Sequence, residues 1–254
     1  MKHFTRILTF LLVGVLLLGC GADTSSPVSS TAPSTTAVPT ETTSPYPVPD
    51  KLIALTFDDG PNANMDTILD ALAEYDAKAT FFVIGKKINV PSDKYIARAF
   101  KEGHEIGSHS FSHEKMTEKT ETEILEEISK TQKAVANVTG VEPVWYRAPF
   151  LAANSLTYSL IQMPHAHTSK AVFDDGKNDT LAEHRKYMVL SNAYDGAIVL
   201  GHVNDITAEV LPEILHELKL QGYEMVTISE LFARKGITPE VGAFQYKDVN
   251  TTTG

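Results

Sequence analysis

Beyond residue 50 the chain alternates short apolar runs with longer amphipathic segments, and this alternation restricts the possible folds more than any other feature. The clearest amphipathic segment, residues 118–138, repeats apolar side chains at helical spacing and is followed by Gly140, which can end a helix. Residues 207–220 and 229–234 show the same pattern. The predicted strands are residues 52–56, 79–83, 105–108, 144–146, 170–173, 197–200 and 223–226. Strands alternating with helices predict an α/β fold with a mainly parallel sheet, either closed into a barrel or left open.

The composition suits one large globular domain and excludes several classes of protein. Of the 254 residues, 43% are hydrophobic and 21% are charged, so the chain is neither fibrous nor wholly disordered. Its net charge of -10 argues against a nucleic-acid partner. Cys20 is the only cysteine, so an intramolecular disulfide is excluded.

The first residues of the chain have the pattern of an export signal. Lys2 and Arg6 precede an apolar run at residues 7–18, which is shorter than the roughly 20 residues that a membrane-spanning helix needs. Residues 17–20 read LLGC and resemble the lipobox of bacterial lipoproteins, in which the signal is cut before a cysteine that is then lipidated. We therefore expect a signal peptide at residues 1–19 and an exported, membrane-anchored extracellular lipoprotein; an ordinary secretory signal with an incidental cysteine is the alternative.

A linker separates this signal from the domain. Of the 30 residues from 21 to 50, 19 are Ser, Thr or Pro, a composition that cannot bury a core. We expect residues 20–50 to form a linker carrying the lipidated Cys20, residues 51–236 to form the functional domain, and residues 237–254 to form a C-terminal tail.

Two motifs with chemistry follow predicted strands. Residues 56–61 read TFDDGP, and the adjacent carboxylates of Asp58 and Asp59 would repel each other unless a cation or an arginine lay nearby. Residues 108–113 read SHSFSH, in which His109 and His113 are four residues apart and would lie on one face of a helical turn. Two histidines and one carboxylate on Zn2+ leave a fourth position open for water, as in hydrolytic metal sites.

The strand positions bring these motifs to one edge of the predicted sheet. Both motifs come after strands, and the carboxyl ends of parallel strands form the rim on which enzymes of this class place their sites. Arg147 follows the fourth predicted strand and His202 follows the sixth. Two acids, three histidines and one arginine at one rim are hard to explain by packing alone.

The ordered motifs TFDDGP, SHSFSH, RAPF and IVLGH, between residues 51 and 236, resemble those of the polysaccharide deacetylase family. This family is also called the NodB-homology family, or carbohydrate esterase family four. The resemblance implies an α/β fold, a distorted (β/α) barrel with about seven parallel strands. It also implies removal of acetyl groups from a glycan with one divalent metal ion, Zn2+ first, with Co2+ or Ni2+ as alternatives. Carried over by position, the metal ligands are Asp59, His109 and His113.

The resemblance also implies roles for the remaining site residues. Asp58 would be the general base, Arg147 its partner, and His202 the general acid. The backbone N-H of Phe150 would help to bind the oxyanion, and Asp179 would orient His202. These roles agree with the chemistry, because a positioned carboxylate can take the proton of an attacking water while an acid protonates the leaving group.

The sequence departs from the family pattern at four positions. Ala148 and Phe150 replace a proline and a tyrosine of the arginine motif. Thr180 stands in place of the tryptophan that normally follows the motif aspartate, and Val203 stands where an aspartate often follows the acid histidine. The setting of the acid and the sugar-stacking surface are therefore the parts least determined by the resemblance.

The expected substrate is an acetylated polysaccharide, most simply the N-acetylglucosamine of peptidoglycan or of a chitin-like glycan. O-deacetylation of acetylated xylan is the alternative, and a non-catalytic glycan-binding lipoprotein is a hypothesis of another class. We expect a monomer attached to the membrane by lipid. His104 is expected to be structural, and His165 and His167, in a loop-like stretch after Pro164, are not expected to bind a metal.

Overall fold

The computed structural model describes residues 44–173, 181–242, 245–250 and 252–253. Cys20, residues 1–43 and Asp179 lie outside the described residues. The strands are β1 Lys51–Gly60, β2 Ala79–Val83, β3 Glu105–Ser108, β4 His165–Ala166, β5 Ala197–His202, β6 Tyr223–Met225, β7 Gln245–Tyr246 and β8 Thr252–Thr253. The α-helices are α1 Asn64–Glu74, α2 Asp93–Lys101, α3 Glu121–Thr139, α4 Ser155–Leu160, α5 Ala182–Leu190, α6 Asp205–Leu220 and α7 Ile228–Arg234.

A parallel sheet in the order β3-β2-β1-β5 forms the regular part of the fold, with β6 also paired to β1. Beyond β3 the pairing continues through isolated bridges from Ser108 to Tyr146 and from Tyr146 to His165. The backbone N-H of Ser169 then donates to the carbonyl of Ile198 in β5 at 2.8 Å. The pairing thus returns to β5 through single contacts, which confirms the expected distorted α/β arrangement.

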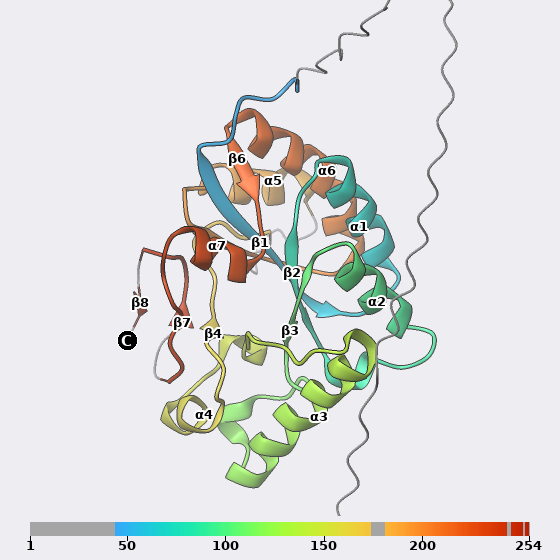
Figure 1. Ribbon diagram of the computed structural model, residues 1–254, viewed down its shortest axis with the longest axis vertical. Helices are drawn as coiled ribbons and strands as arrows, with labels where there is room; N and C mark the ends of the chain where they lie inside the picture. Colours follow the sequence, from blue (N-terminus) through green and yellow to red (C-terminus); the bar gives the residue numbers. More distant parts are fainter. Residues whose placement is uncertain (1–43, 174–180, 243–244, 251, 254) are drawn as a thin grey trace, which may run out of the picture. The chain divides into compact units, whose positions relative to one another are not determined.

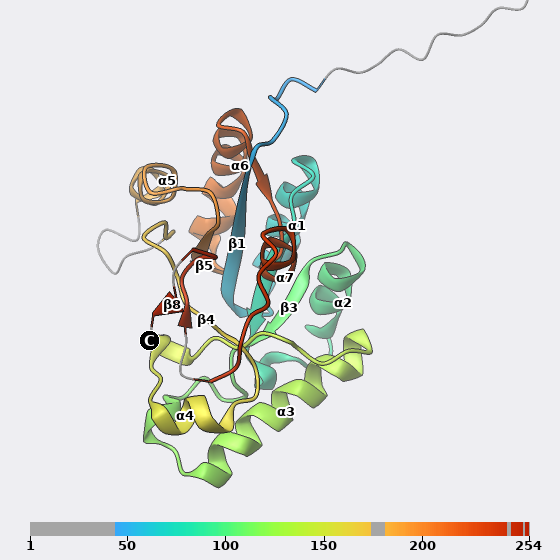
Figure 2. The ribbon, with the colours of Figure 1, turned by 60° about the vertical axis from the view of Figure 1, so that its left-hand side comes forward.

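The irregular part differs from the predicted strands. Residues 144–146 and 170–173 are reduced to single bridges at Tyr146 and Val172, whereas β4, β7 and β8 were not predicted. Pro143 and Pro149 flank the first of these segments, and proline cannot donate a ladder hydrogen bond. The pair β7 and β8 is antiparallel, and Figure 2 shows β8 near β4 at this side of the fold.

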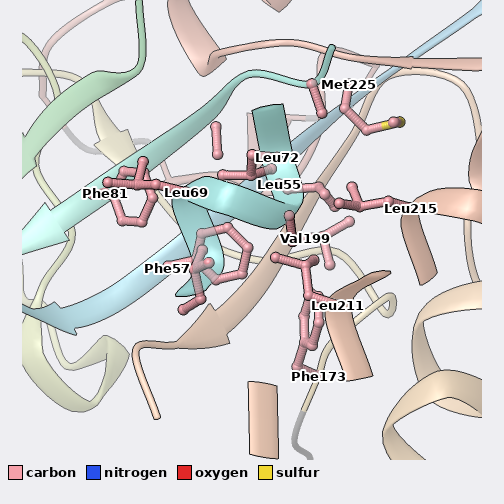
Figure 3. Close-up of a cluster of buried hydrophobic side chains, with 14 of the residues drawn as sticks. Leu55, Phe57, Leu69, Leu72, Phe81, Phe173, Val199, Leu211, Leu215 and Met225 are labelled. Atoms are coloured by element: carbon pink, nitrogen blue, oxygen red, sulfur yellow. The ribbon is translucent and has the colours of Figure 1, made fainter. Parts of the chain in front are cut away.

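Strand β1 divides the core into two clusters because successive side chains point to opposite faces. Ile53, Leu55 and Phe57 pack with α1 and α6, which lie side by side in Figure 1, and Figure 3 shows Leu55 and Phe57 in this cluster. Leu52 and Ala54 belong to the second cluster, on the α7 side. Thr56 and Asp58 lie on the same face of β1 as Ala54. The site is therefore built on the face of the sheet that carries the second cluster.

Helix α3 matches its predicted position closely, because its ends carry strong signals. Thr120 and Glu123 form a capping box at the start, and Gly140 takes a φ of 81° at the end. Both ribbon views place α3 at one end of the sheet, beside α4. This position brings α3 next to the loop that carries the predicted histidines.

Packing continues beyond residue 236. Tyr246 and Val249 are buried in the second cluster together with Trp145 and Phe232. The ring of Tyr246 lies 5.0 Å from that of Phe232 and 5.9 Å from that of Trp145. In the described ranges, every helix is too short or too polar to cross a membrane.

Candidate active site

A β-bulge at the end of β1 brings two neighbouring carboxylates into one cavity. Side chains of successive strand residues normally face opposite sides, but the β1–β2 register shifts between Asp58 and Gly60. Asp59, at the bulge, has a φ of 69°. Asp58 and Asp59 therefore both line a cavity of about 360 Å³.

Asp58 is held by the arginine that the sequence placed at the same rim. Nη1 of Arg147 donates to Oδ1 of Asp58 at 2.8 Å and to Oγ1 of Thr56 at 2.6 Å. Nη2 of Arg147 donates to the carbonyl of His167 at 2.7 Å. Asp58 and Arg147 are 2% and 0% exposed, so this ion pair is fully desolvated and fixes the orientation of the carboxylate.

The guanidinium of Arg147 also rests on an aromatic ring. Its Cζ lies 4.3 Å from the ring centre of Phe82 in β2. Gly107 in β3 leaves room for that ring, since an added Cβ would come 2.5 Å from Cδ1 of Phe82. Strands β2 and β3 thus hold Arg147 in place, and Arg147 in turn holds Asp58.

The two motif histidines meet the second carboxylate, but not through a helical turn. Residues 109–115 form a loop in which Ser110 and His113 both have a φ of 61°, so the expected helical turn is wrong. Nε2 of His109 and Nε2 of His113 lie 3.6 Å and 3.2 Å from Oδ1 of Asp59. The loop therefore brings both histidines to Asp59, as their spacing predicted, without forming a helical turn.

The donor set of these three residues fits a divalent metal. One ligand atom from each of Asp59, His109 and His113 lies within 4.8 Å of the other two. Oδ1 of Asp59 is buried without a well-aligned hydrogen-bond donor, as expected of an oxygen meant for a cation. Nδ1 of His109 lies 2.8 Å from the carbonyl of Arg147. With a proton on Nδ1, the lone pair of Nε2 is free to bind a metal ion beside Asp59.

The surroundings favour the ionisation states that a metal requires. Burial opposes the charge on Asp59, yet the contact with His113 and the nearby His109 lower its pKa to about 2. Burial lowers the pKa of His109 against the opposing effect of Asp58 and Asp59. A charged carboxylate and a neutral imidazole are the ligand forms for a divalent ion.

Glu127 of α3 holds the histidine loop, and the sequence analysis missed it. Its Oε2 accepts the backbone N-H groups of Phe111 at 2.9 Å and of Ser112 at 2.7 Å, midway between the two histidines. Glu127 is 9% exposed. Its position could have been found from the helical pattern, because it lies three residues after Ile124 and four before Thr131 on the apolar face.

The rim of the cavity carries the remaining predicted residues. His202 ends β5, where it pairs with Asp58 in the strand register, and it lines the cavity with Phe150 and Thr168. Phe150 has a φ of 58° and is 62% exposed, and its ring lies 4.9 Å from that of His113. Of the predicted site residues, the structure brings Asp58, Asp59, His109, His113, Phe150 and His202 to one cavity, with Arg147 bonded to Asp58, whereas Asp179 lies outside the described residues. Thr168 is an addition.

Backbone strain is concentrated here. Five of the six non-glycine residues with positive φ in the described part of the chain belong to the site segments: Asp59, Ser110, His113, Phe150 and Leu151. Such conformations cost energy and persist where the surrounding structure imposes them, which occurs most often at functional sites.

Comparison with known proteins agrees with this geometry. A family model described as polysaccharide deacetylase matches residues 46–166. A peptidoglycan-N-acetylglucosamine deacetylase of Bacillus cereus is 35% identical over 204 residues, covering 73% of this chain and 90% of that protein. The chain belongs to the polysaccharide deacetylase family.

Two further relatives have names that refer to xylan. A bifunctional xylanase/deacetylase of Pseudobutyrivibrio xylanivorans is 41% identical over 194 residues, covering 75% of this chain but only 32% of that longer protein. A family 4 acetyl xylan esterase from Clostridium thermocellum, solved with a cobalt ion, has a TM-score of 0.75 at 34% identity and covers 79% of this chain and 100% of that one.

Proposed function

We propose that the protein hydrolyses the acetamido group of N-acetylglucosamine residues in peptidoglycan or a chitin-like glycan, using one divalent metal ion. The observation that carries the proposal is the buried ion pair of Asp58 and Arg147 beside the ligand group of Asp59, His109 and His113. A proton acceptor next to three metal ligands in one cavity is the combination that metal-assisted hydrolysis requires.

In the proposed reaction Asp58 takes the proton of the attacking water. Its Oδ1 is occupied by Arg147, whereas Oδ2 faces the ligand group, 3.8 Å from Nε2 of His109. Arg147 stops the carboxylate from rotating, so Oδ2 is presented to a water lying between Asp58 and the acetyl carbonyl.

The groups across the cavity complete the reaction. The water oxygen bonds to the carbonyl carbon, and the oxyanion that forms accepts a hydrogen bond from the backbone N-H of Phe150. His202 donates a proton to the sugar nitrogen as the C-N bond breaks, giving acetate and a free amine. Protonation matters here because an amine anion is a very poor leaving group. We include Asp179 as the residue that orients His202.

The ligand set would hold one divalent ion, for which we propose Zn2+, with Co2+ and Ni2+ as alternatives. When bound, such an ion polarises the acetyl carbonyl and acidifies water. The Clostridium thermocellum esterase, solved in complex with a cobalt ion, supports the choice of a divalent transition metal.

Two other functions are the alternatives to this proposal. O-deacetylation of xylan is supported by the names of the xylanase/deacetylase and the acetyl xylan esterase relatives. A non-catalytic glycan-binding role is opposed by the intact base, arginine and ligand set.

Acetate release by the purified protein decides among these functions. The substrates are N-acetylglucosamine oligomers, peptidoglycan and acetylated xylan, each assayed after chelation and again after Zn2+, Co2+ or Ni2+ is restored. We expect metal-dependent release from the N-acetylated substrates. Release from xylan alone would favour the esterase, and no release from any substrate would favour the binding protein.

We also propose that the protein is exported, cut before Cys20, and held at the extracellular face of the membrane as a monomer by lipid on that cysteine. The lipobox-like sequence at residues 17–20 supports this, and one acyl chain alone would anchor it weakly. Cys20→Ser should move the protein from the membrane fraction to the medium or leave an uncleaved precursor. Normal processing and unchanged fractionation would contradict lipidation.

A further inference from the structure

The active-site cavity opens between two hollows of opposite character. One, which we call the lysine hollow, has a volume of about 430 Å³ and is lined by His167, Thr168, Ser169, Lys170, Tyr194, Lys247 and Asp248. Thr168 lines both this hollow and the active-site cavity, so the two spaces adjoin at this residue. A glycan whose reacting sugar lies at Asp58 would reach the lysine hollow by passing Thr168.

The hollow on the other side, of about 460 Å³, shares His113 and Phe150 with the active-site cavity. It is lined by three glutamates, Glu114, Glu118 and Glu123, and by two lysines. Both lysines are engaged: Lys119 pairs with Glu114, and Lys115 lies 3.5 Å from Glu118. This side offers no uncompensated positive charge.

The two lysines of the lysine hollow, unlike Lys115 and Lys119, are not held in ion pairs with other described residues. Among the described residues, no hydrogen bond or ion pair engages the ammonium group of Lys170 or Lys247. Asp248, the one acid lining the hollow, already accepts the hydroxyl of Tyr194 at 2.5 Å and the backbone N-H of Asn250 at 2.7 Å. Two lysines and one engaged carboxylate among the described residues that line it give this hollow a net positive charge, in a chain whose net charge is -10.

The fold brings these lysines together. Lys170 follows β4 and Lys247 follows β7, and the two strands pair in parallel, with Ala166 opposite Tyr246. The backbone N-H of His167 donates to the carbonyl of Tyr246 at 2.8 Å, which fixes the two segments side by side. The same His167 offers its own carbonyl to Arg147, so the segment that carries Lys170 is tied to the arginine that holds Asp58.

We propose that the lysine hollow is a subsite for a carboxylate-bearing sugar next to the sugar that is deacetylated, so that the substrate is an acidic glycan. This inference rests on the proposed function, which places the reacting acetyl group at Asp58. Ammonium groups recognise carboxylates as point charges. Lys170 is exposed and Lys247 is half-buried, and the partial burial of Lys247 strengthens its attraction for an anion. The carboxylate can belong to a lactyl ether on an N-acetylated sugar, as in muramic acid, or to a uronic acid attached to xylan. Neutral chitin-like and xylan chains lack it.

The test uses matched glycans that differ only in this charge. The probes are a tetrasaccharide of alternating N-acetylglucosamine and N-acetylmuramic acid, its carboxyl methyl ester, and chitotetraose. Acetylated xylan with and without glucuronic acid forms the second pair. We expect kcat/KM to be higher on the acid than on its methyl ester, and the difference to shrink as ionic strength rises.

Lys170→Gln and Lys247→Gln should each reduce kcat/KM on the acidic glycan by about two- to fivefold, and the double variant by about tenfold. Activity on chitotetraose should stay unchanged, because neither lysine touches the reacting group. Lys133→Gln on α3, another exposed lysine with no ion pair in the described structure, is the control and should behave as the unmodified protein. A preference that appears only within one pair of substrates identifies the source of the carboxylate.

Equal kcat/KM on the acid and its ester would overturn the subsite, and so would an equal loss on chitotetraose in the double variant. Absence of acetate release from every substrate would instead reject the proposed function. In that case calorimetric binding of the acidic tetrasaccharide and its methyl ester still tests the subsite, since tighter binding of the acid must depend on Lys170 and Lys247.

Discussion

The two sides of the active-site cavity are built differently. On one side, β1, β3 and β5 are regular strands whose ends supply the carboxylates, the first motif histidine and His202. On the other side, Tyr146, β4 and β7 join through bridges of one or two residue pairs, and they carry Arg147, Thr168 and the lysine hollow. The regular side holds the proposed proton acceptor, the proposed acid and two of the three candidate metal ligands, whereas the irregular side holds Arg147 and most of the residues that would contact the rest of a glycan.

This difference indicates how one fold can serve several substrates. Regular strands fix their side chains through many shared hydrogen bonds, so the reacting groups keep their geometry when the neighbouring loops change. Short pairings are held by few contacts, so side chains there can vary without disturbing the strands. Substitutions on the two sides should therefore have effects of different size and kind.

The largest effect is expected at the end of β1. Asp58→Asn should keep the metal but lower kcat by roughly two to four orders of magnitude, because the proton acceptor is lost. Asp59→Asn should weaken metal binding, so its activity should partly return in excess metal. Elemental analysis and acetate release as a function of metal concentration measure both. Metal rescue of Asp58→Asn, with none for Asp59→Asn, would reverse the two roles.

A smaller and substrate-dependent effect is expected at the end of β5. His202→Ala should reduce release from an N-acetylated glycan by roughly a hundredfold, because the amine leaves only when protonated. Cleavage of an activated acetyl ester should fall much less, since its leaving group needs no proton. Parallel kcat measurements on the two substrates test this. Equal losses on both would remove the case for His202 as the acid.

Sequence patterns predicted the regular side well. The strands at residues 79–83 and 105–108 have the observed limits, since each is a short and mostly buried run paired within the sheet. The first strand extends beyond the predicted residue 56 to Gly60, because its polar end still pairs with β5. Motifs placed after strands were enough to bring Asp58, Asp59 and His109 to one cavity.

Local backbone geometry and long-range pairing could not be predicted in the same way. No periodicity indicates the bulge at Asp59 or the loop geometry at His113, because both depend on contacts with neighbouring segments. The pairing of β4 with β7 joins two-residue strands too short to produce an alternating pattern. The closeness of Lys170 and Lys247 follows from that pairing and was not visible in the sequence.

Glu127 connects the regular side to a helix, and its replacement should have an intermediate effect. Glu127→Gln weakens two charge-assisted hydrogen bonds to the loop between His109 and His113. Metal affinity should therefore fall roughly tenfold, as for other residues that orient ligands indirectly, and activity should return at saturating metal. Glu126→Gln, which alters an exposed pair with Lys130, is the control. A loss of kcat that saturating metal does not restore would contradict a positioning role.

The smallest effect is expected on the stability of the fold, where two buried histidines, one on each side, can be compared. Burial lowers the pKa of both His104 and His165 to about 4, against an ordinary value of 6.5. The unfolded chain therefore takes up protons first, so stability is complete above pH 6.5 and declines as the pH falls toward 4. Replacing either histidine with phenylalanine should weaken this decline, which urea unfolding at pH 7.5 and pH 5 can measure.

At pH 7.5 the two replacements should differ, because only one histidine has a clear hydrogen-bonding task. Nδ1 of His104 accepts the backbone N-H of Ala79 at 3.1 Å, so His104→Phe leaves a buried donor unpaired at a cost of about 1 kcal/mol or more. Neither ring nitrogen of His165 makes a well-aligned hydrogen bond among the described residues, and its ring packs 5.0 Å and 4.9 Å from those of Tyr146 and Tyr158. An apolar ring of similar shape should fit there almost without cost. If His165→Phe lowered the urea midpoint as much as His104→Phe, the irregular side would be as tightly specified as the regular one, and the contrast between the two sides would fail.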